Sequence, residues 1–140
     1  MSIDRLVEWI KMEEGFSDVP YKDSLGHITF GHGLTNITYD ESVMLVKNRL
    51  DKFSEFVDQK LDHMGISIDG FRRDVLIDMC YQLGTAGICC FVKMWEALKN
   101  MDYDEAADQM LDSLWKDQTP NRCKLLAERM RNGYDRQRDG

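Results

Sequence analysis

The chain has 140 residues, enough for one domain with its own core, and its 43% hydrophobic and 31% charged residues are ordinary for a folded globular protein. No apolar run approaches the roughly 18 residues of a membrane-spanning helix, so we expect no stable membrane association. The net charge of -7 disfavours nucleic acid as a partner, because binding phosphate requires a basic surface.

The N-terminal residues indicate a cytoplasmic chain, and this compartment decides how the cysteines are interpreted. Asp4 and Glu8 interrupt the apolar stretch that a secretory signal would need. Reduced thiols are the norm in the cytoplasm, and no CxxC pair suggests zinc, so we expect every cysteine to be a packing thiol. The three histidines lack helical metal spacing, and we expect no metal site. The cysteines are Cys80, Cys89, Cys90 and Cys123.

The first 37 residues predict a helix followed by a small antiparallel sheet. Four apolar residues at helical spacing predict an amphipathic helix over residues 3–14, which ends at Gly15. Residues 16–37 then contain a proline, glycines and short runs of β-forming residues. This composition predicts a twisted hairpin with its turn at Ser24-Leu25-Gly26.

A long helix is predicted next. Thr38 and Glu41 have the spacing of a capping box, and apolar residues follow at intervals of three or four as far as Met64. A helix of roughly 25 residues is about 37 Å long. It therefore matches or exceeds the diameter of a compact chain of this size, whose radius of gyration is about 14 Å. We expect this helix to bridge two lobes with a cleft between them.

The remainder of the chain predicts helices only. Asp69 leads into the first of them, which Gly84 stops, and the Thr119 hydroxyl is expected to cap the last one, with Pro120 at its first position. We expect these helices over residues 71–83, 90–99, 102–113 and 120–133. The predicted fold class is α+β, mostly α, in a single domain of two lobes. Its expected parts are a hairpin lobe at about 12–40, the bridging helix at about 39–64, and a helical lobe at about 65–140 plus helix 3–14.

Glu14, rather than Glu13, is the candidate acid of the first helix. At 100° per residue Glu14 lies about 30° from the centre of the apolar stripe, and Glu13 about 70° from it. We therefore expect Glu14 to point inward, where desolvation and the negative end of the helix dipole favour the protonated form that a general acid needs. The alternative is a structural carboxylate paired with an arginine such as Arg122.

Asp23 and Thr29 are the candidate residues of the hairpin. If Gly26 is left-handed in a three-residue loop, Asp23 pairs opposite His27, and Thr29 lies on the same face at about 7–8 Å. A carboxylate and a hydroxyl side by side can share one water. The alternative is that Asp23 only starts the turn and Thr29 only forms strand, and a one-residue slip would separate the two onto opposite faces.

Two sets of motifs extend this constellation over nearly the whole chain. The first surrounds the three residues: Glu14-Gly, Tyr-Lys-Asp23 and Gly-x-x-Thr29-x-Gly-x-Gly. The second, in the C-terminal half, includes Trp115-x-x-Gln-Thr-Pro-Asn-Arg122. Together these motifs resemble the phage-type lysozymes of glycoside hydrolase family 24, best known from the T-even phages.

The resemblance implies an inverting muramidase that needs no cofactor and hydrolyses the β-1,4 bond between N-acetylmuramic acid and N-acetylglucosamine. Glu14 would be the general acid, Asp23 the second carboxylate and Thr29 the hydroxyl that positions water. An inverting enzyme needs the two carboxyls about 6.5–9.5 Å apart. The resemblance also implies substrate contacts at Thr35, Tyr81 and Gln109, and we expect Gln82, beside Tyr81 on the cleft side, to be a further contact. It implies that Arg122 pairs with the acid Glu14.

Two positions depart from the family pattern. Leu34 stands where the family usually has a histidine after the last hairpin glycine, and His32 lies one glycine earlier, at an apolar position of the family. Any charge pair that the family histidine makes with the long helix is therefore absent. We expect this difference to reduce stability rather than activity.

The resemblance further implies a soluble, monomeric endolysin that degrades bacterial peptidoglycan during phage-induced lysis. It would act in the periplasm and cell wall after a holin releases it from the host cytoplasm. A lytic transglycosylase, which uses one glutamate and no hydrolytic water, is the first alternative, and Asp23 and Thr29 argue against it. A catalytically silent wall-binding module is the second, and only the intact triad argues against that one. A helical nucleic-acid-binding domain is disfavoured by the acidic charge.

Overall fold

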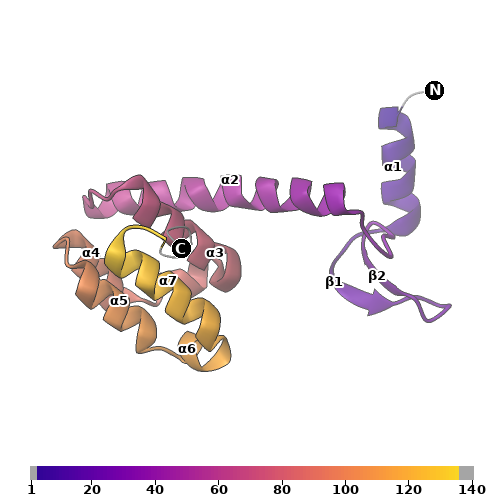
Figure 1. Ribbon diagram of the computed structural model, residues 1–140. Coiled ribbons are helices and arrows are strands. Elements are labelled where there is room, and N and C mark those ends of the chain that lie inside the picture. Colours follow the sequence, from indigo (N-terminus) through magenta and orange to yellow (C-terminus); the bar gives the residue numbers. More distant parts are fainter. Residues whose placement is uncertain (1–2, 136–140) are drawn as a thin grey trace. The chain divides into compact units, whose positions relative to one another are not determined.

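The structure, a computed structural model, describes residues 3–135 and divides into two compact units (Figure 1). The N-terminal unit is Met1–Leu45 and the C-terminal unit is Val46–Gly140. Helices make up most of the described chain, and a two-stranded antiparallel sheet lies in the N-terminal unit. The predicted α+β, mostly α class is therefore confirmed.

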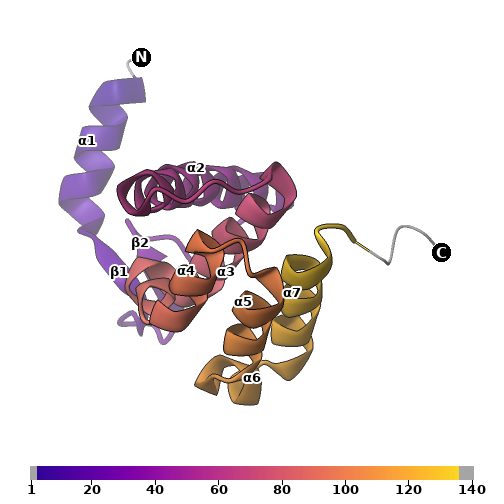
Figure 2. The same cartoon turned by 90° about the vertical axis from the view of Figure 1, so that its left-hand side faces the viewer.

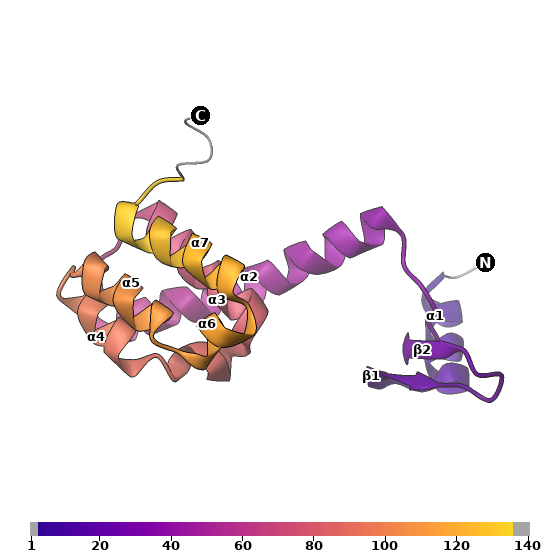
Figure 3. The same cartoon turned by 60° about the horizontal axis from the view of Figure 1, so that its bottom comes forward.

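The N-terminal unit contains a helix and a hairpin: α1 (Ile3–Glu14), β1 (Ser17–Lys22) and β2 (Ile28–Gly31). Gly15 ends α1 as predicted, with a left-handed φ of +67° and its N–H bonded to the Lys11 carbonyl at 3.0 Å. The two strands run side by side and antiparallel (Figure 3), with Tyr21 opposite Thr29. The predicted hairpin is confirmed.

Helix α2 (Tyr39–Met64) begins with the predicted capping box. The Glu41 N–H donates to Thr38 Oγ1 at 3.1 Å, and the Thr38 N–H donates to Glu41 Oε1 at 2.9 Å. The hydrogen bond from the Thr38 N–H, and after it a bond from the Thr38 side chain, hold the pKa of the Glu41 carboxyl below its usual value. The 26 residues of α2 agree with the predicted length.

The C-terminal unit continues with α3 (Gly70–Cys89), α4 (Val92–Lys99), α5 (Tyr103–Leu111), α6 (Leu114–Gln118) and α7 (Pro120–Asn132). Gly84, with φ +78° and ψ 167°, breaks α3 at the predicted stop, and helical turns resume after it. Helix α6 was not predicted. The expected Thr119 cap is wrong, because its hydroxyl donates to the Trp115 carbonyl instead of capping α7. Figures 1 and 2 show α7 beside α5.

The core of the C-terminal unit is formed by residues of α2 through α7. Trp95 is among its largest members, 2% exposed, and its indole N–H donates to the Ile88 carbonyl at 3.0 Å. Cys80 and Cys123 are buried in this core, as predicted for packing thiols, and burial raises the pKa of the Cys80 thiol to about 11. Cys90 is exposed, so the prediction that every cysteine packs in the interior is wrong for this one.

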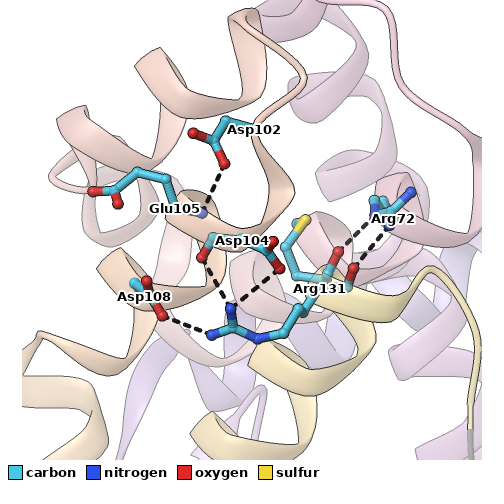
Figure 4. A network of polar contacts seen from close by, with 7 residues as sticks. Arg72, Asp102, Asp104, Glu105, Asp108 and Arg131 are labelled. Atoms are coloured by element: carbon cyan, nitrogen blue, oxygen red, sulfur yellow. Dashed lines mark hydrogen bonds and ion pairs between the residues drawn. The ribbon is translucent and has the colours of Figure 1, made fainter.

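Two arginines fix the end of α7 within the C-terminal unit (Figure 4). Arg72 donates to the carbonyls of Met130 and Arg131 at 2.6 and 3.0 Å, which satisfies acceptors in the last turn of α7. Its guanidinium carbon lies 3.7 Å from the centre of the Tyr103 ring. Arg131 in turn bonds to two aspartates of α5, Asp104 at 3.2 Å and Asp108 at 2.7 Å.

The helices of the described chain are too short or too polar to cross a membrane singly. Within residues 3–135, no single helix is long and apolar enough to cross a bilayer. Among the described helices, α3 and α4 taken together reach that length and composition, and they are bent by 99° with respect to each other.

Candidate active site

All three predicted catalytic residues, Glu14, Asp23 and Thr29, belong to the N-terminal unit. Glu14 is the last residue of α1, Asp23 directly follows β1, and Thr29 lies in β2. Thr29 is 4% exposed and is the only buried residue among residues 3–45. Among these residues, the side chain least exposed to solvent is therefore one that carries a hydroxyl.

The hairpin turn holds Asp23 by one of its two carboxylate oxygens. Oδ1 accepts the backbone N–H groups of Leu25 at 2.9 Å and His27 at 2.8 Å, which is the Asx-turn pattern. The Asp23 N–H donates to the His27 carbonyl at 2.8 Å, and Gly26 has a φ of +84°, so the predicted loop and pairing are confirmed. Oδ2 takes no part in these backbone bonds and lies 3.7 Å from the His27 ring nitrogen Nδ1. Asp23 thus starts the turn and still presents a second oxygen.

Thr29 and Asp23 lie on the same face of the hairpin. The register places Tyr21 opposite Thr29, and alternation along β1 and its continuation puts Asp23 on the face of Tyr21. Thr29 Oγ1 donates to the His27 carbonyl at 3.2 Å. Because the hydroxyl hydrogen is used in this bond, the oxygen lone pairs are left to accept a hydrogen from another molecule.

Glu14 contacts the glycine turn that follows β2. A Cβ atom at Gly33 would lie 2.6 Å from Glu14 Oε2 and 2.7 Å from its carboxyl carbon, so only glycine leaves room for this carboxylate. Both Glu14 and Glu13 are exposed, and the predicted burial of Glu14 is therefore wrong for this structure. What distinguishes Glu14 is its contact with Gly33, since the three atoms nearest to that Cβ position all belong to Glu14.

Three further predicted residues line cavities within their own units. Thr35 lines an open cavity of about 480 Å³ beside the hairpin turn, together with His27. Tyr81 and Arg122 share a cavity of about 480 Å³ in the C-terminal unit, where the Arg122 guanidinium bonds to Asp78. The implied pairing of Arg122 with Glu14 joins residues of the two units and stays a prediction.

The two predicted glutamines have separate surroundings in the C-terminal unit. Gln82 Nε2 donates to Thr119 Oγ1 at 2.9 Å, while its buried Oε1 has no hydrogen-bond partner among the described residues. Gln109 Nε2 donates to Glu105 Oε1 at 2.7 Å, and Gln109 lines a different cavity of about 560 Å³ with Trp115. The structure therefore does not place Tyr81 and Gln109 in one cavity, and their contacts with substrate stay predictions.

Gly33 and His27 were not predicted as parts of the site. The sequence carried a signal for Gly33, the repeated glycines of Gly-x-Gly after Thr29, but its contact with Glu14 depends on the path of the chain after β2. His27 follows directly from the predicted register, which put it opposite Asp23. In the described part of the chain, no three His, Cys, Asp or Glu side chains converge as metal ligands.

The fold and site together define a mostly helical protein whose N-terminal unit holds two carboxylates and a hydroxyl, Glu14 on α1 and Asp23 and Thr29 on the hairpin. The phage lysozyme family matches residues 11–132, and the chain belongs to that family. A similar protein is the probable T4-type lysozyme 1 of Dictyostelium discoideum, 26% identical over 99 residues. The match covers 69% of this chain and 58% of that relative's length.

Proposed function

We propose that this protein is a peptidoglycan hydrolase that cleaves the β-1,4 bond between N-acetylmuramic acid and N-acetylglucosamine with inversion. Membership of the phage lysozyme family supports the reaction class. The observation that carries the proposal is the arrangement of Asp23 and Thr29, which share one hairpin face and each offer an oxygen to a water molecule. The Dictyostelium relative is named a probable lysozyme, and this name supports the same reaction class.

Water activation follows from the direction of the hydrogen bonds. Asp23 Oδ2 and Thr29 Oγ1 are both acceptors toward a shared water, because Oδ1 is held by the turn and the threonine hydrogen by the His27 carbonyl. A water that donates both of its hydrogens to these atoms presents a lone pair outward as the nucleophile. As this oxygen attacks the anomeric carbon, its proton passes to Asp23.

Glu14 supplies the proton at the other end of the reaction. Protonated Glu14 donates to the glycosidic oxygen as the bond breaks, so the leaving sugar departs as an alcohol. Gly33 keeps the space in which this carboxyl lies. Thr35, Tyr81, Gln82 and Gln109 are the proposed substrate contacts, with Arg122 in support of the acid.

The proposed biological role is that of an endolysin in phage-induced lysis. The protein would accumulate in the host cytoplasm, pass through a holin-dependent opening and act as a monomer on the wall from the periplasm. Co-expression with and without a holin, followed by fractionation and turbidity, tests this role. Lysis that is independent of a holin would contradict it.

Product analysis of digested peptidoglycan tests the reaction itself. The proposal predicts reducing muramic acid ends, with the newly formed anomer of the α configuration as expected for inversion of a β bond. Anhydromuramic ends would instead establish a lytic transglycosylase, and a β anomer would establish a retaining mechanism. A fold-intact protein that binds the wall but releases no products would establish a silent wall-binding module.

A further inference from the structure

The chain segment around Glu14 touches the glycine turn after β2 at two places. The first is the contact of the Glu14 carboxylate with Gly33. The second lies two residues further along, where the Phe16 ring faces the His32 imidazole with centroids 5.1 Å apart and planes tilted by 46°. This separation is within the range of favourable aromatic pairs.

A register shift in the hairpin explains why these residues meet. Pairing runs Tyr21 to Thr29 near the turn, but Ser17 pairs with Gly31 after an irregularity in β1. Extending the Ser17–Gly31 pairing by one residue puts Phe16 opposite His32. Without the shift, the register of Tyr21 and Thr29 would have put Phe16 opposite Leu34 instead. The irregularity therefore selects the partner of Phe16.

The turn that carries His32 has little freedom of its own. Gly31 and Gly33 both have left-handed φ values, +59° and +74°. Phe30 and Leu34 exchange two backbone hydrogen bonds at 2.8 and 2.9 Å, which closes the turn between them. A ring fixed at position 32 therefore lies at a set place relative to Gly33, the residue that Glu14 contacts.

We propose that Phe16 and His32 are a positioning pair that holds the Glu14 carboxyl against Gly33. Glu14 and Phe16 are separated only by Gly15, which lacks a Cβ and adopts a φ of +67°; without a further contact, the many conformations open to glycine would let the end of α1 turn relative to the hairpin. The aromatic contact fixes this link. The role requires a ring at position 32 rather than imidazole acid–base chemistry. The expected effect of this pair on kcat rests on the proposed function, in which Glu14 is the general acid.

The test compares His32→Leu, His32→Phe and Phe16→Leu with the wild type. The control is Tyr39→Leu, which removes a ring from an 83% exposed position of the same unit. In the full-length protein, a nuclear Overhauser cross-peak between Gly33 Hα and Glu14 Hγ reports the contact directly, because a Cβ at Gly33 would lie 2.9 Å from Glu14 Cγ. We expect the cross-peak in the wild type, His32→Phe and Tyr39→Leu, and its loss in the two ring-deleting leucine variants of the pair.

Kinetics on soluble peptidoglycan chains give the functional readout. We expect His32→Leu and Phe16→Leu to lower kcat about tenfold with little change in KM, since a displaced acid slows chemistry more than binding. His32→Phe should restore the wild-type kcat. Retention of the cross-peak or of kcat in His32→Leu, or failure of His32→Phe to rescue, would overturn the positioning role. A wild type without any product would overturn the proposed function instead, and the cross-peak comparison would still decide the positioning role.

Discussion

The two units of this protein differ in what they bury. The C-terminal unit buries a contiguous apolar core that includes Trp95, Met110 and Leu126. Within residues 3–45, by contrast, the only buried side chain is that of Thr29, a candidate catalytic residue. This difference indicates that turns, glycines and hydrogen bonds position the candidate catalytic side chains of the N-terminal unit. The apolar core that stabilises the fold is concentrated in the C-terminal unit.

Helix α1 illustrates what the N-terminal unit lacks. Its apolar residues Ile3, Val7 and Ile10 are 69%, 47% and 46% exposed, so its apolar stripe finds no core inside its own unit. The predicted association of helix 3–14 with the helical lobe would supply that core, and it stays a prediction. The positions of Asp23 and Thr29 depend instead on the hairpin.

The largest expected effect belongs to the core of the C-terminal unit. Trp95→Ala removes a 2% exposed side chain and its hydrogen bond to Ile88, and should lower the free energy of unfolding by about 3–5 kcal/mol. Urea denaturation measures this loss. Met12→Ala, at an 83% exposed residue of α1 outside its apolar stripe, is the control, and an equal loss there would contradict the comparison.

The next effect should separate activity from stability. Gly33→Ala places a Cβ 2.6 Å from Glu14 Oε2 and should lower kcat about 100-fold, because the carboxyl must move. Gly65→Ala is the matched control, since Gly65 also has a positive φ, +64°, but nothing within 4 Å of its Cβ position. Both variants should lose about 1 kcal/mol of stability to backbone strain. Equal kcat values for the two would show that the Gly33 contact has no role.

A moderate effect is expected at the end of α7. Arg72→Met leaves the carbonyls of Met130 and Arg131 without their donor and should lower the free energy of unfolding by about 2 kcal/mol. The exposed Arg49 provides the control substitution Arg49→Met. Melting temperatures and the kcat of both variants complete the test. Loss of kcat by Arg72→Met at a temperature where it is fully folded would contradict the division between the two units.

The smallest effect concerns an ion pair of the C-terminal unit. A hydrogen bond from Arg73 holds the pKa of the Asp58 carboxyl below its usual value. A lowered folded-state pKa contributes stability above the unfolded-state pKa, and this contribution is lost as the pH falls through the folded-state value. The Asp58 side chain is 51% exposed, so Asp58→Asn should cost only about 0.2–1 kcal/mol at pH 7. The difference from wild type should shrink as unfolding is measured at lower pH, and a constant difference would contradict it.

Local signals made much of the fold predictable. The capping box of Thr38 and Glu41 and the left-handed Gly26 both act through neighbouring residues, and both are confirmed. Helix α6 has only five residues, too few for a periodic pattern. The Thr119 cap failed because Gln82, distant in sequence, and Trp115 compete for its hydroxyl.

The site was predictable to a similar extent. The register of Asp23 and Thr29 followed from turn chemistry and is confirmed. Helical phase indicated that Glu14 differs from Glu13, but phase assumes a core beneath α1, and the N-terminal unit provides none. The contact of Glu14 with Gly33 depends on the path of the chain after β2, which no local pattern predicted.

Clearing of exposed cell walls by Glu14→Gln and Glu13→Gln is the most direct test of the central claim, that Glu14 is the acid of a site carried by the N-terminal hairpin. Both residues end α1 and are exposed, so the two substitutions are closely matched. The account predicts that Glu14→Gln lowers the clearing rate by about 10²- to 10⁴-fold with unchanged melting, while Glu13→Gln clears like the wild type. Wild-type clearing by Glu14→Gln would contradict the account.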